Sequence, residues 1–325
     1  MTQPVSLAKS LSPPFSKDRS IVTLLQVHHP VAIIYGHQLL RPREDPRNYL
    51  DCELNTPKLN LIHQHLWLAG VARPARPLHR QKLLDRTIYL TESPDEHLVW
   101  HELRIFVKPL PEFLLNFEYW EKELCGDEDL YKCACGLLLS YIWLVGHKSD
   151  LHIAHETGVF PKEVDWLMWT SFVEDFLSNM NLLTLHQVNK RYQYGELRLS
   201  RLNSLYRYTP SVFSVRNFMY GFMSSSTWYK AFFERNFAWL LAVFVYVTVI
   251  LSAMQVGLAT ERLQGNLQFQ EASYSFAITS IVTVVAMVGV ILLMWVVLFC
   301  YHLGSTMQYT RHVRSDKERR LYDRH

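Results

Sequence analysis

The chain has 325 residues, 49% of them hydrophobic and 19% charged, and a formal net charge of +3 at pH 7. The stretch before Phe237 is long enough for a folded core, and the small charge without a nucleic-acid-reading motif disfavours nucleic acid as a partner. The sequence signatures of serine hydrolases, nucleotide-binding loops and kinases do not occur, so no enzyme class is assigned and no cofactor is predicted.

The first 236 residues are expected to form a tail and a folded domain. Residues 1–20 are polar and rich in proline and serine, which is typical of a disordered tail. Residues 21–236 are predicted to form a mainly α cytosolic domain with a small antiparallel β element. Thr56 followed by Pro57 is typical of a helix start, and this helix is expected to run to Gly70.

Short runs of β-branched and aromatic residues predict a small β-meander near residues 87–107. From Pro111 onward the pattern is helical, and the apolar run Leu137–Val145 is too short for a membrane span, so it predicts a buried helix. The segment Gln187–Tyr208 is expected to be a basic amphipathic helix or a pair of strands, and both alternatives stay open.

Histidines and acidic residues cluster in one short stretch. His152 and His155 are three residues apart on a predicted helix, so their imidazoles would lie on one face and could share a metal ion. The order differs from the His-Glu-x-x-His motif, because Glu156 directly follows the second histidine. The metal candidates are therefore His147, His152, His155 and Glu156, with a solvated helix face as the alternative.

The last quarter of the chain contains two long apolar runs. Asn236–Thr260 and Ala272–Thr310 contain no Asp, Glu, Lys or Arg. A membrane-crossing helix needs roughly 20 mostly apolar residues, and both runs are long enough. We predict a transmembrane hairpin in residues 237–325, with spans at 237–258 and 277–301 and a basic tail.

Flanking cations predict the orientation of this hairpin. Lys230 and Arg235 precede the first span, a basic tail follows the second, and the loop between them has only Arg262. Because Lys and Arg stay on the cytoplasmic side, both termini of this two-span integral membrane protein are expected in the cytosol. The cations expected to contact anionic lipid are Lys190, Arg191, Arg198, Arg201, Lys230, Arg235, Arg311, Arg314, Lys317, Arg319 and Arg320.

Several short motifs resemble those of a family of fungal membrane proteins of unknown function. They are Ile62-His63-x-His65-Leu66-Trp67, Arg76-Pro77-Leu78-His79-Arg80-Gln81, Asp95-x-His97-Leu98-Val99-Trp100, Arg104-Ile105-Phe106-Val107-Lys108-Pro109, and the segment from Tyr206 to Trp228. The resemblance runs from about Leu50 to Arg320 and implies a filamentous-fungal source and two C-terminal spans. It implies no catalytic residues.

Three functional hypotheses follow. The first is a non-enzymatic scaffold or recruitment factor at an internal membrane, whose partners are the lipid bilayer and either a partner protein or further copies of the chain. The second is an accessory or catalytic component of fungal secondary metabolism. The third is an oligomeric ion channel with the layout of CorA-type magnesium channels, although Gly257-Leu258-Ala259-Thr260 stands where those channels carry Gly-Met-Asn.

Overall fold

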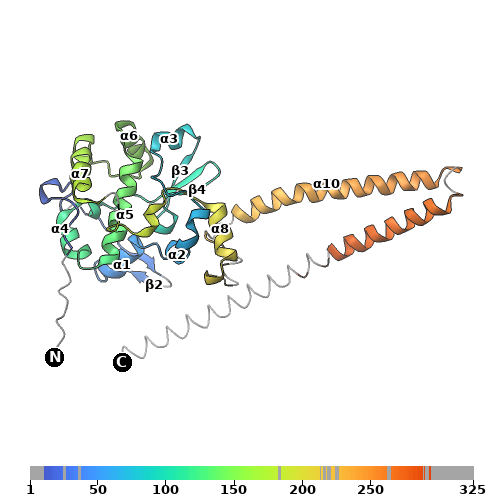
Figure 1. Cartoon of the computed structure of the whole chain (residues 1–325), viewed down its shortest axis with the longest axis horizontal. Helices are drawn as coiled ribbons and strands as arrows, with labels where there is room; N and C mark the ends of the chain where they lie inside the picture. The colour runs from blue at the N-terminus through green and yellow to red at the C-terminus, as the bar shows by residue number, and fades with distance from the viewer. Residues whose placement is uncertain are drawn as a thin grey trace, which may run out of the picture. The chain divides into compact units, whose positions relative to one another are not determined.

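The computed structural model (Figure 1) describes residues 11–24, 27–35, 38–181, 184–212, 214, 217, 221–223, 227–261, 265–287, 289 and 293. The chain divides into two compact units, Met1–Ser224 and Ser225–His325. Unit 1 is mainly helical with two small sheets, which confirms the predicted fold class for this part of the chain.

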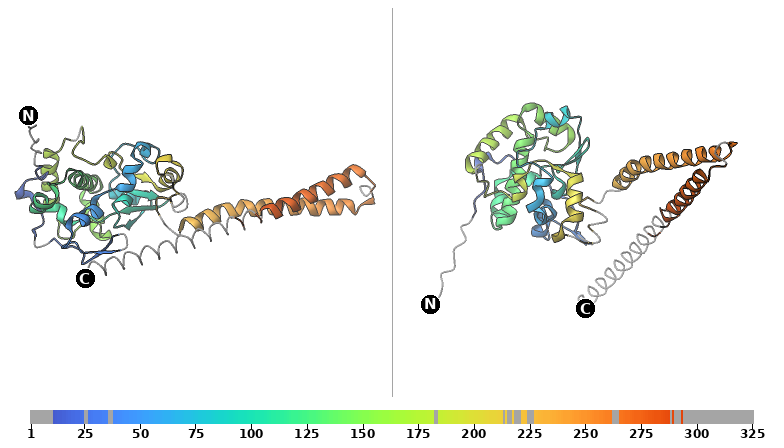
Figure 2. Two further views of the ribbon diagram at one scale, coloured as in Figure 1. Left: turned by 90° about the horizontal axis from the view of Figure 1, so that it is seen from below. Right: turned by 45° about the vertical axis from the view of Figure 1, so that its right-hand side comes forward.

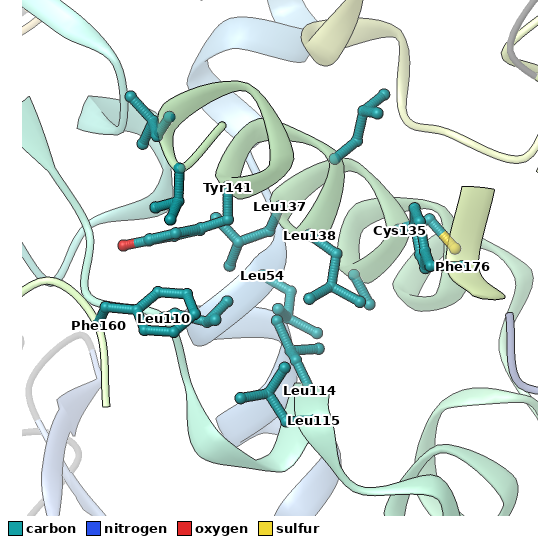
Figure 3. Close-up of a cluster of buried hydrophobic side chains, with 14 of the residues drawn as sticks. Leu54, Leu110, Leu114, Leu115, Cys135, Leu137, Leu138, Tyr141, Phe160 and Phe176 are labelled. Carbon is teal, nitrogen blue, oxygen red and sulfur yellow. The ribbon is translucent and has the colours of Figure 1, made fainter. Parts of the chain in front are cut away.

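Helix α5 is the centre of unit 1 (Figures 1 and 2). Asp127 begins it by accepting hydrogen bonds from the backbone N–H groups of Asp129 and Leu130. Its residues Leu137, Leu138 and Tyr141 point into a core that α1 and the segment before α4 complete (Figure 3). The predicted buried helix is therefore confirmed. The helices of unit 1 are α1 (Pro46–Leu54), α2 (Pro57–Leu61), α3 (Leu78–Leu83), α4 (Phe117–Tyr119), α5 (Glu128–Leu144), α6 (Lys148–Thr157), α7 (Trp166–Asn179) and α8 (Leu199–Tyr208).

The predicted β-meander is wrong in its pairing. The strands are β1 (Ile33–Tyr35), β2 (Gln38–Leu40), β3 (Thr87–Leu90), β4 (Val99–His101), β5 (Arg104–Val107) and β6 (Leu197–Arg198). Strands β1 and β2 form an antiparallel pair, while the second sheet is mixed and has the order β3-β5-β4-β6. Strand β3 pairs with β5 in parallel instead of forming a hairpin with β4.

A tie between distant segments explains this pairing. The connection between β3 and β4 contains a 3₁₀ turn, Pro94–Glu96. Within it the Asp95 carboxylate accepts hydrogen bonds from the backbone N–H groups of Lys58 and Leu59 at 3.4 and 3.1 Å. This connection is therefore held against the start of α2 and does not form the tight turn of a hairpin.

One predicted helix is divided, and the segment left open as a helix or a pair of strands contains an element of each kind. The helix expected from Pro57 to Gly70 is divided into α2 and a 3₁₀ segment, His63–Leu68. A Cβ atom on Gly70 would lie 2.6 Å from the Glu196 carbonyl oxygen, so only glycine allows this close approach of two backbones. The segment Gln187–Tyr208 contains a 3₁₀ turn, strand β6 and then α8.

The N-terminal tail is shorter than predicted. Phe15 is buried and its ring packs against Phe117, Trp120 and Phe172. Ser16 donates a side-chain hydrogen bond to Asp175 at 3.0 Å. Residues 11–20 therefore belong to the folded unit, and residues 1–10 of the predicted disordered tail lie outside the described residues.

Unit 2 contains α10 (Thr227–Leu258), which includes the first predicted span, and a further helical stretch at residues 267–287. Part of the second predicted span, 277–301, belongs to this stretch. Most of the remainder, and the whole basic tail, lie outside the described residues. The structure therefore confirms one apolar helix of the predicted hairpin and leaves the second as a prediction.

Candidate functional site

A buried carboxylate and two histidines form the densest group of potential ligands in unit 1. His79 lies on α3, His147 directly precedes α6, and Asp150 lies in the first turn of α6. One carboxylate oxygen of Asp150 accepts the backbone N–H of His79 at 2.7 Å and lies 2.8 Å from His79 Nδ1. The other accepts the backbone N–H of His147 at 2.9 Å and lies 3.3 Å from His147 Nδ1.

Local sequence fixes both helices that carry this group. Pro77 has its φ locked and precedes the first turn of α3, where its missing N–H costs nothing. Asp150 is the third residue of α6 and caps its start, while Gly158 ends the helix with a left-handed φ of 72°. Helices α3 and α6 contact each other, and this contact brings His79 to a capping residue 71 positions away.

The group is buried at its base and open to solvent at its rim. The Asp150 side chain is 0% exposed, whereas those of His79 and His147 are 32% and 67% exposed. One ligand atom from each residue can be chosen so that all three lie within 4.8 Å of one another. The two rings are nearly perpendicular, with centroids 5.1 Å apart. An imidazole pair beside a carboxylate is chemistry that suits a divalent transition metal.

The other predicted metal candidates lie apart from this group. His152 pairs with Glu156 at 3.2 Å on exposed surface, and Glu156 also accepts from Lys82 at 3.1 Å. The Lys82 ammonium lowers the pKa of Glu156. The His155 ring packs against Phe160, and its Nε2 is buried without a partner among the described residues. Of the predicted four, only His147 joins His79 and Asp150.

The sequence motifs gave no signal for His79 as a ligand, because 68 positions separate it from His147 and only the α3–α6 contact brings the two together.

A tight polar network holds α3 in place. Both oxygens of Glu196 accept hydrogen bonds from Arg76, Gln81 and Arg86 at 2.7–3.0 Å. Although burial acts in the other direction, the hydrogen bonds from the two guanidinium groups lower the pKa of Glu196 to about 2.

The basic residues expected to meet lipid divide into two groups. Lys190, Arg198 and Arg201 are exposed on unit 1. Arg191 is instead buried, and its guanidinium donates to the backbone carbonyls of His97, Tyr194 and Gly195. Burial also lowers its pKa to about 10. Because protein encloses the side chain, the expectation of lipid contact is wrong for Arg191.

The remaining predicted lipid contacts fall on residues whose side chains the structure does not describe. Lys230 and Arg235 belong to α10, and their side chains lie outside the part that the structure describes. The five tail cations lie outside the described residues, namely Arg311, Arg314, Lys317, Arg319 and Arg320.

A shallow groove with aromatic walls lies beside one of the exposed cations. It has a volume of about 700 Å³ and includes Trp67, Leu68, Arg201 and Tyr208 in its lining. The Trp67 and Tyr208 residues are 62% and 70% exposed. The Arg201 guanidinium donates a hydrogen bond to the Leu68 carbonyl at 2.9 Å, which places its charge at the groove wall.

Among the described residues, α10 supplies the single unbroken helix that is long and apolar enough to cross a membrane. Its window Leu241–Leu258 has a mean hydropathy of 2.1, and none of its residues is buried. Helices α5 and α6 would pass the same test together as a broken span bent by 114°. The buried residues of α5 lie in the core of unit 1, so α10 is the stronger membrane candidate.

Comparison with known proteins gives one match. Residues 46–284, well over half of the chain, match a family described as a family of unknown function, DUF6601. No curated protein and no solved structure matches the chain.

Proposed function

This chain belongs to the DUF6601 family, a family of unknown function, and from that premise we propose that it is a membrane-anchored recruitment factor. Unit 2 would hold the protein in a bilayer, and unit 1 would bind a partner protein at the cytosolic surface. The observation that carries the proposal is the exposed apolar surface of α10.

Water is a poor solvent for this helix. The window Leu241–Leu258 has ten residues of the Leu, Ile, Val and Phe class and no charged residue. At about −0.3 to −0.6 kcal/mol each at the centre of a span, these residues favour insertion by roughly 3 to 6 kcal/mol. A soluble protein would bury such a helix, yet here no residue of the window is buried.

We propose the two-span topology with both termini in the cytosol. The helical stretch 267–287 begins shortly after α10 ends, as a return span would. The cations that precede the first run and follow the second favour this orientation.

Membrane fractionation and glycosylation mapping test the anchor and its orientation. The full chain is expected to stay in the pellet after alkaline carbonate extraction and to be released by detergent. An acceptor Asn-x-Thr sequence built into residues 262–266 should be glycosylated in microsomes, and one added after His325 should not. Release by carbonate alone would contradict the anchor, and a glycan at the C-terminus would contradict the orientation.

The groove with Trp67, Arg201 and Tyr208 is the proposed lipid-facing surface of unit 1. Trp and Tyr combine an apolar ring with a polar edge and gather at membrane interfaces, while Arg attracts anionic headgroups. In nanodiscs of the full chain, hydrogen exchange in residues 61–71 and 199–210 is expected to slow when anionic lipid is added. High salt or the variant R201Q should remove this protection, and equal exchange with neutral and anionic lipid would refute the assignment.

The β1–β2 hairpin is the proposed recruitment surface. Its residues Ile34 and Leu39 are 80% and 74% exposed, and Val31, which lies just before β1, is 93% exposed, an apolar face unusual for open surface. Because the sheet has two strands, each has an outer edge that can pair with a further strand. We therefore assign an extended protein segment with aliphatic side chains as the occupant.

A variant pair tests this recruitment. The change of Ile34 and Leu39 to Thr keeps β propensity and removes the apolar face, whereas L103T changes a leucine elsewhere that is 57% exposed. Cross-linking from a photoreactive residue at position 38 should yield the same partner adduct in wild type and L103T, and none in the Thr pair. An adduct that survives in the Thr pair would refute the hairpin as the recruitment surface. No observation on the described residues favours the alternatives of secondary metabolism or ion conduction.

A further inference from the structure

We propose that His79, His147 and Asp150 bind one divalent transition-metal ion of the zinc class at the contact of α3 and α6. The site is independent of the membrane anchor and of the recruitment surface. Three features support the site: the chemistry of the three side chains, the buried carboxylate, and the open rim of the group.

The donor set selects the class of ion. Two imidazole nitrogens and one carboxylate oxygen suit Zn²⁺ and its neighbours in the first transition series. Ca²⁺ and Mg²⁺ require mostly oxygen ligands, and this group supplies one carboxylate. Three protein ligands leave the fourth tetrahedral position for water or a small ligand.

The buried carboxylate of Asp150 lies beside two imidazoles and two backbone N–H groups. Its carboxylate is 0% exposed, and its ion-pair partners among the described residues are His79 and His147. Both imidazoles carry a charge only when protonated, and no Lys or Arg pairs with this carboxylate in the described part of the chain. A divalent ion would place positive charge directly beside this carboxylate.

The geometry needs a small adjustment. Tetrahedral ligands at about 2.05 Å from zinc lie roughly 3.3 Å apart. The ligand atoms here lie within 4.8 Å of one another, so the widest separation must shorten by about 1.5 Å at most. The exposed rings can supply this through χ rotation, because His147 is 67% and His79 is 32% exposed. The same exposure gives the ion a path from solvent.

The geometry also indicates what the ion would do. His79 belongs to α3, while His147 and Asp150 belong to the start of α6. An ion shared by these residues would cross-link the two helices and stabilise the contact between them. Metal binding is therefore expected to raise the thermal unfolding midpoint of unit 1.

The test uses the full, untagged chain in detergent micelles after removal of metal with a chelator. Titration with Co²⁺, read by visible absorption, should give the intense bands of a four-coordinate ion and a stoichiometry of one per chain. Added Zn²⁺ should displace Co²⁺ and abolish these bands. A titration without such bands, or with a six-coordinate spectrum alone, would overturn the proposal.

Single substitutions locate the ion. H79Q and H147Q should each weaken Co²⁺ binding by more than about 10-fold, because losing a direct ligand costs at least as much as losing a supporting one. H152Q is the matched control, since His152 is also on α6 and its side chain is 77% exposed. Binding that is retained in H79Q and H147Q, or lost equally in H152Q, would place the ion elsewhere and overturn the assignment. Unchanged circular dichroism of the variants shows that the fold is intact.

Discussion

Glu196 is a residue whose loss should weaken unit 1 strongly, and the substitution E196Q tests this. The Glu196 side chain is 8% exposed, and it pairs with Arg76 and Arg86 at 2.7 Å each. Glutamine keeps the size of the side chain and can still accept a hydrogen bond. It removes the negative charge and leaves a buried guanidinium, that of Arg86, without its partner.

Two lines of reasoning give the magnitude. The pKa of Glu196 falls from 4.5 to about 2, and at about 1.36 kcal/mol per pKa unit this corresponds to roughly 3 kcal/mol. Removing one partner of a buried ion pair costs about 3–5 kcal/mol. Because the Arg76 side chain is 32% exposed, solvent partly screens the ion pair between Arg76 and Glu196. We therefore expect the free energy of unfolding of E196Q to be lower by about 3 kcal/mol.

The pH dependence gives an independent check with a definite sign. The folded-state pKa of Glu196 is depressed, so its contribution is fully present above pH 4.5 and is lost as the pH falls towards 2. Wild type should lose stability across this window, and E196Q should lose about 3 kcal/mol less of it.

Urea unfolding of the full chain in non-ionic micelles measures both effects. The reporter is tryptophan fluorescence, because Trp100 stacks on Arg86 with 4.3 Å between guanidinium carbon and ring centroid. The control E128Q removes an exposed pair with Lys132, and its unfolding free energy should change by less than about 1 kcal/mol. If E196Q and E128Q have the same effect, or the acid slope is unchanged in E196Q, the reasoning about this network is refuted.

Three further substitutions test other parts of the structure. Burial raises the pKa of Asp95 to about 6. The free energy of unfolding should therefore fall by about 3 kcal/mol as the pH rises from 3.8 to 6. Urea titrations at several pH values measure this slope, and D95N should abolish it. In G136A the new Cβ would lie 2.1 Å from a ring carbon of Tyr192, so thermal unfolding should show a free energy of unfolding lower by about 1–3 kcal/mol. The control G126A has open space at the new Cβ, and its free energy of unfolding should fall by less than about 1 kcal/mol. The substitution V249R places a charge at the middle of the apolar window, at a cost of about 3 kcal/mol for insertion. It should lower the fraction of the chain in the carbonate-resistant pellet, which V249L should not.

The elements predicted correctly depend on signals that lie within one short stretch of sequence. The run Leu137–Val145 is apolar on all sides, and α5 is buried on nearly all sides. The uncharged run before Thr260 predicts an exposed apolar helix, and α10 has that character. In both cases the composition of one helix determines its environment without help from distant residues.

The errors have a common origin in contacts between distant residues. Nothing local to residues 87–107 shows that Asp95 will accept the backbone N–H groups of Lys58 and Leu59 and so direct β4 away from β3. Arg191 has the sequence context of a surface cation, yet its guanidinium is enclosed by the carbonyls of residues 97, 194 and 195. A burial pattern of this kind is set by the tertiary fold and cannot be predicted from local charge.

The candidate site also depends on contacts between distant residues. Three buried acids each join segments that are remote in sequence. Asp95 joins the β3–β4 connection to α2, Glu196, directly before β6, joins Gln81 of α3, and Asp150 joins α6 to α3. Two of these ties meet on α3, which carries His79. The position of His79 against Asp150 therefore depends on Glu196 as well, although the two acids belong to different networks. We infer that E196Q should loosen the α3–α6 contact, so that in micelles at neutral pH its Co²⁺ affinity falls while the four-coordinate spectrum is retained. The same affinity in E196Q and wild type would show that Asp150 alone positions His79.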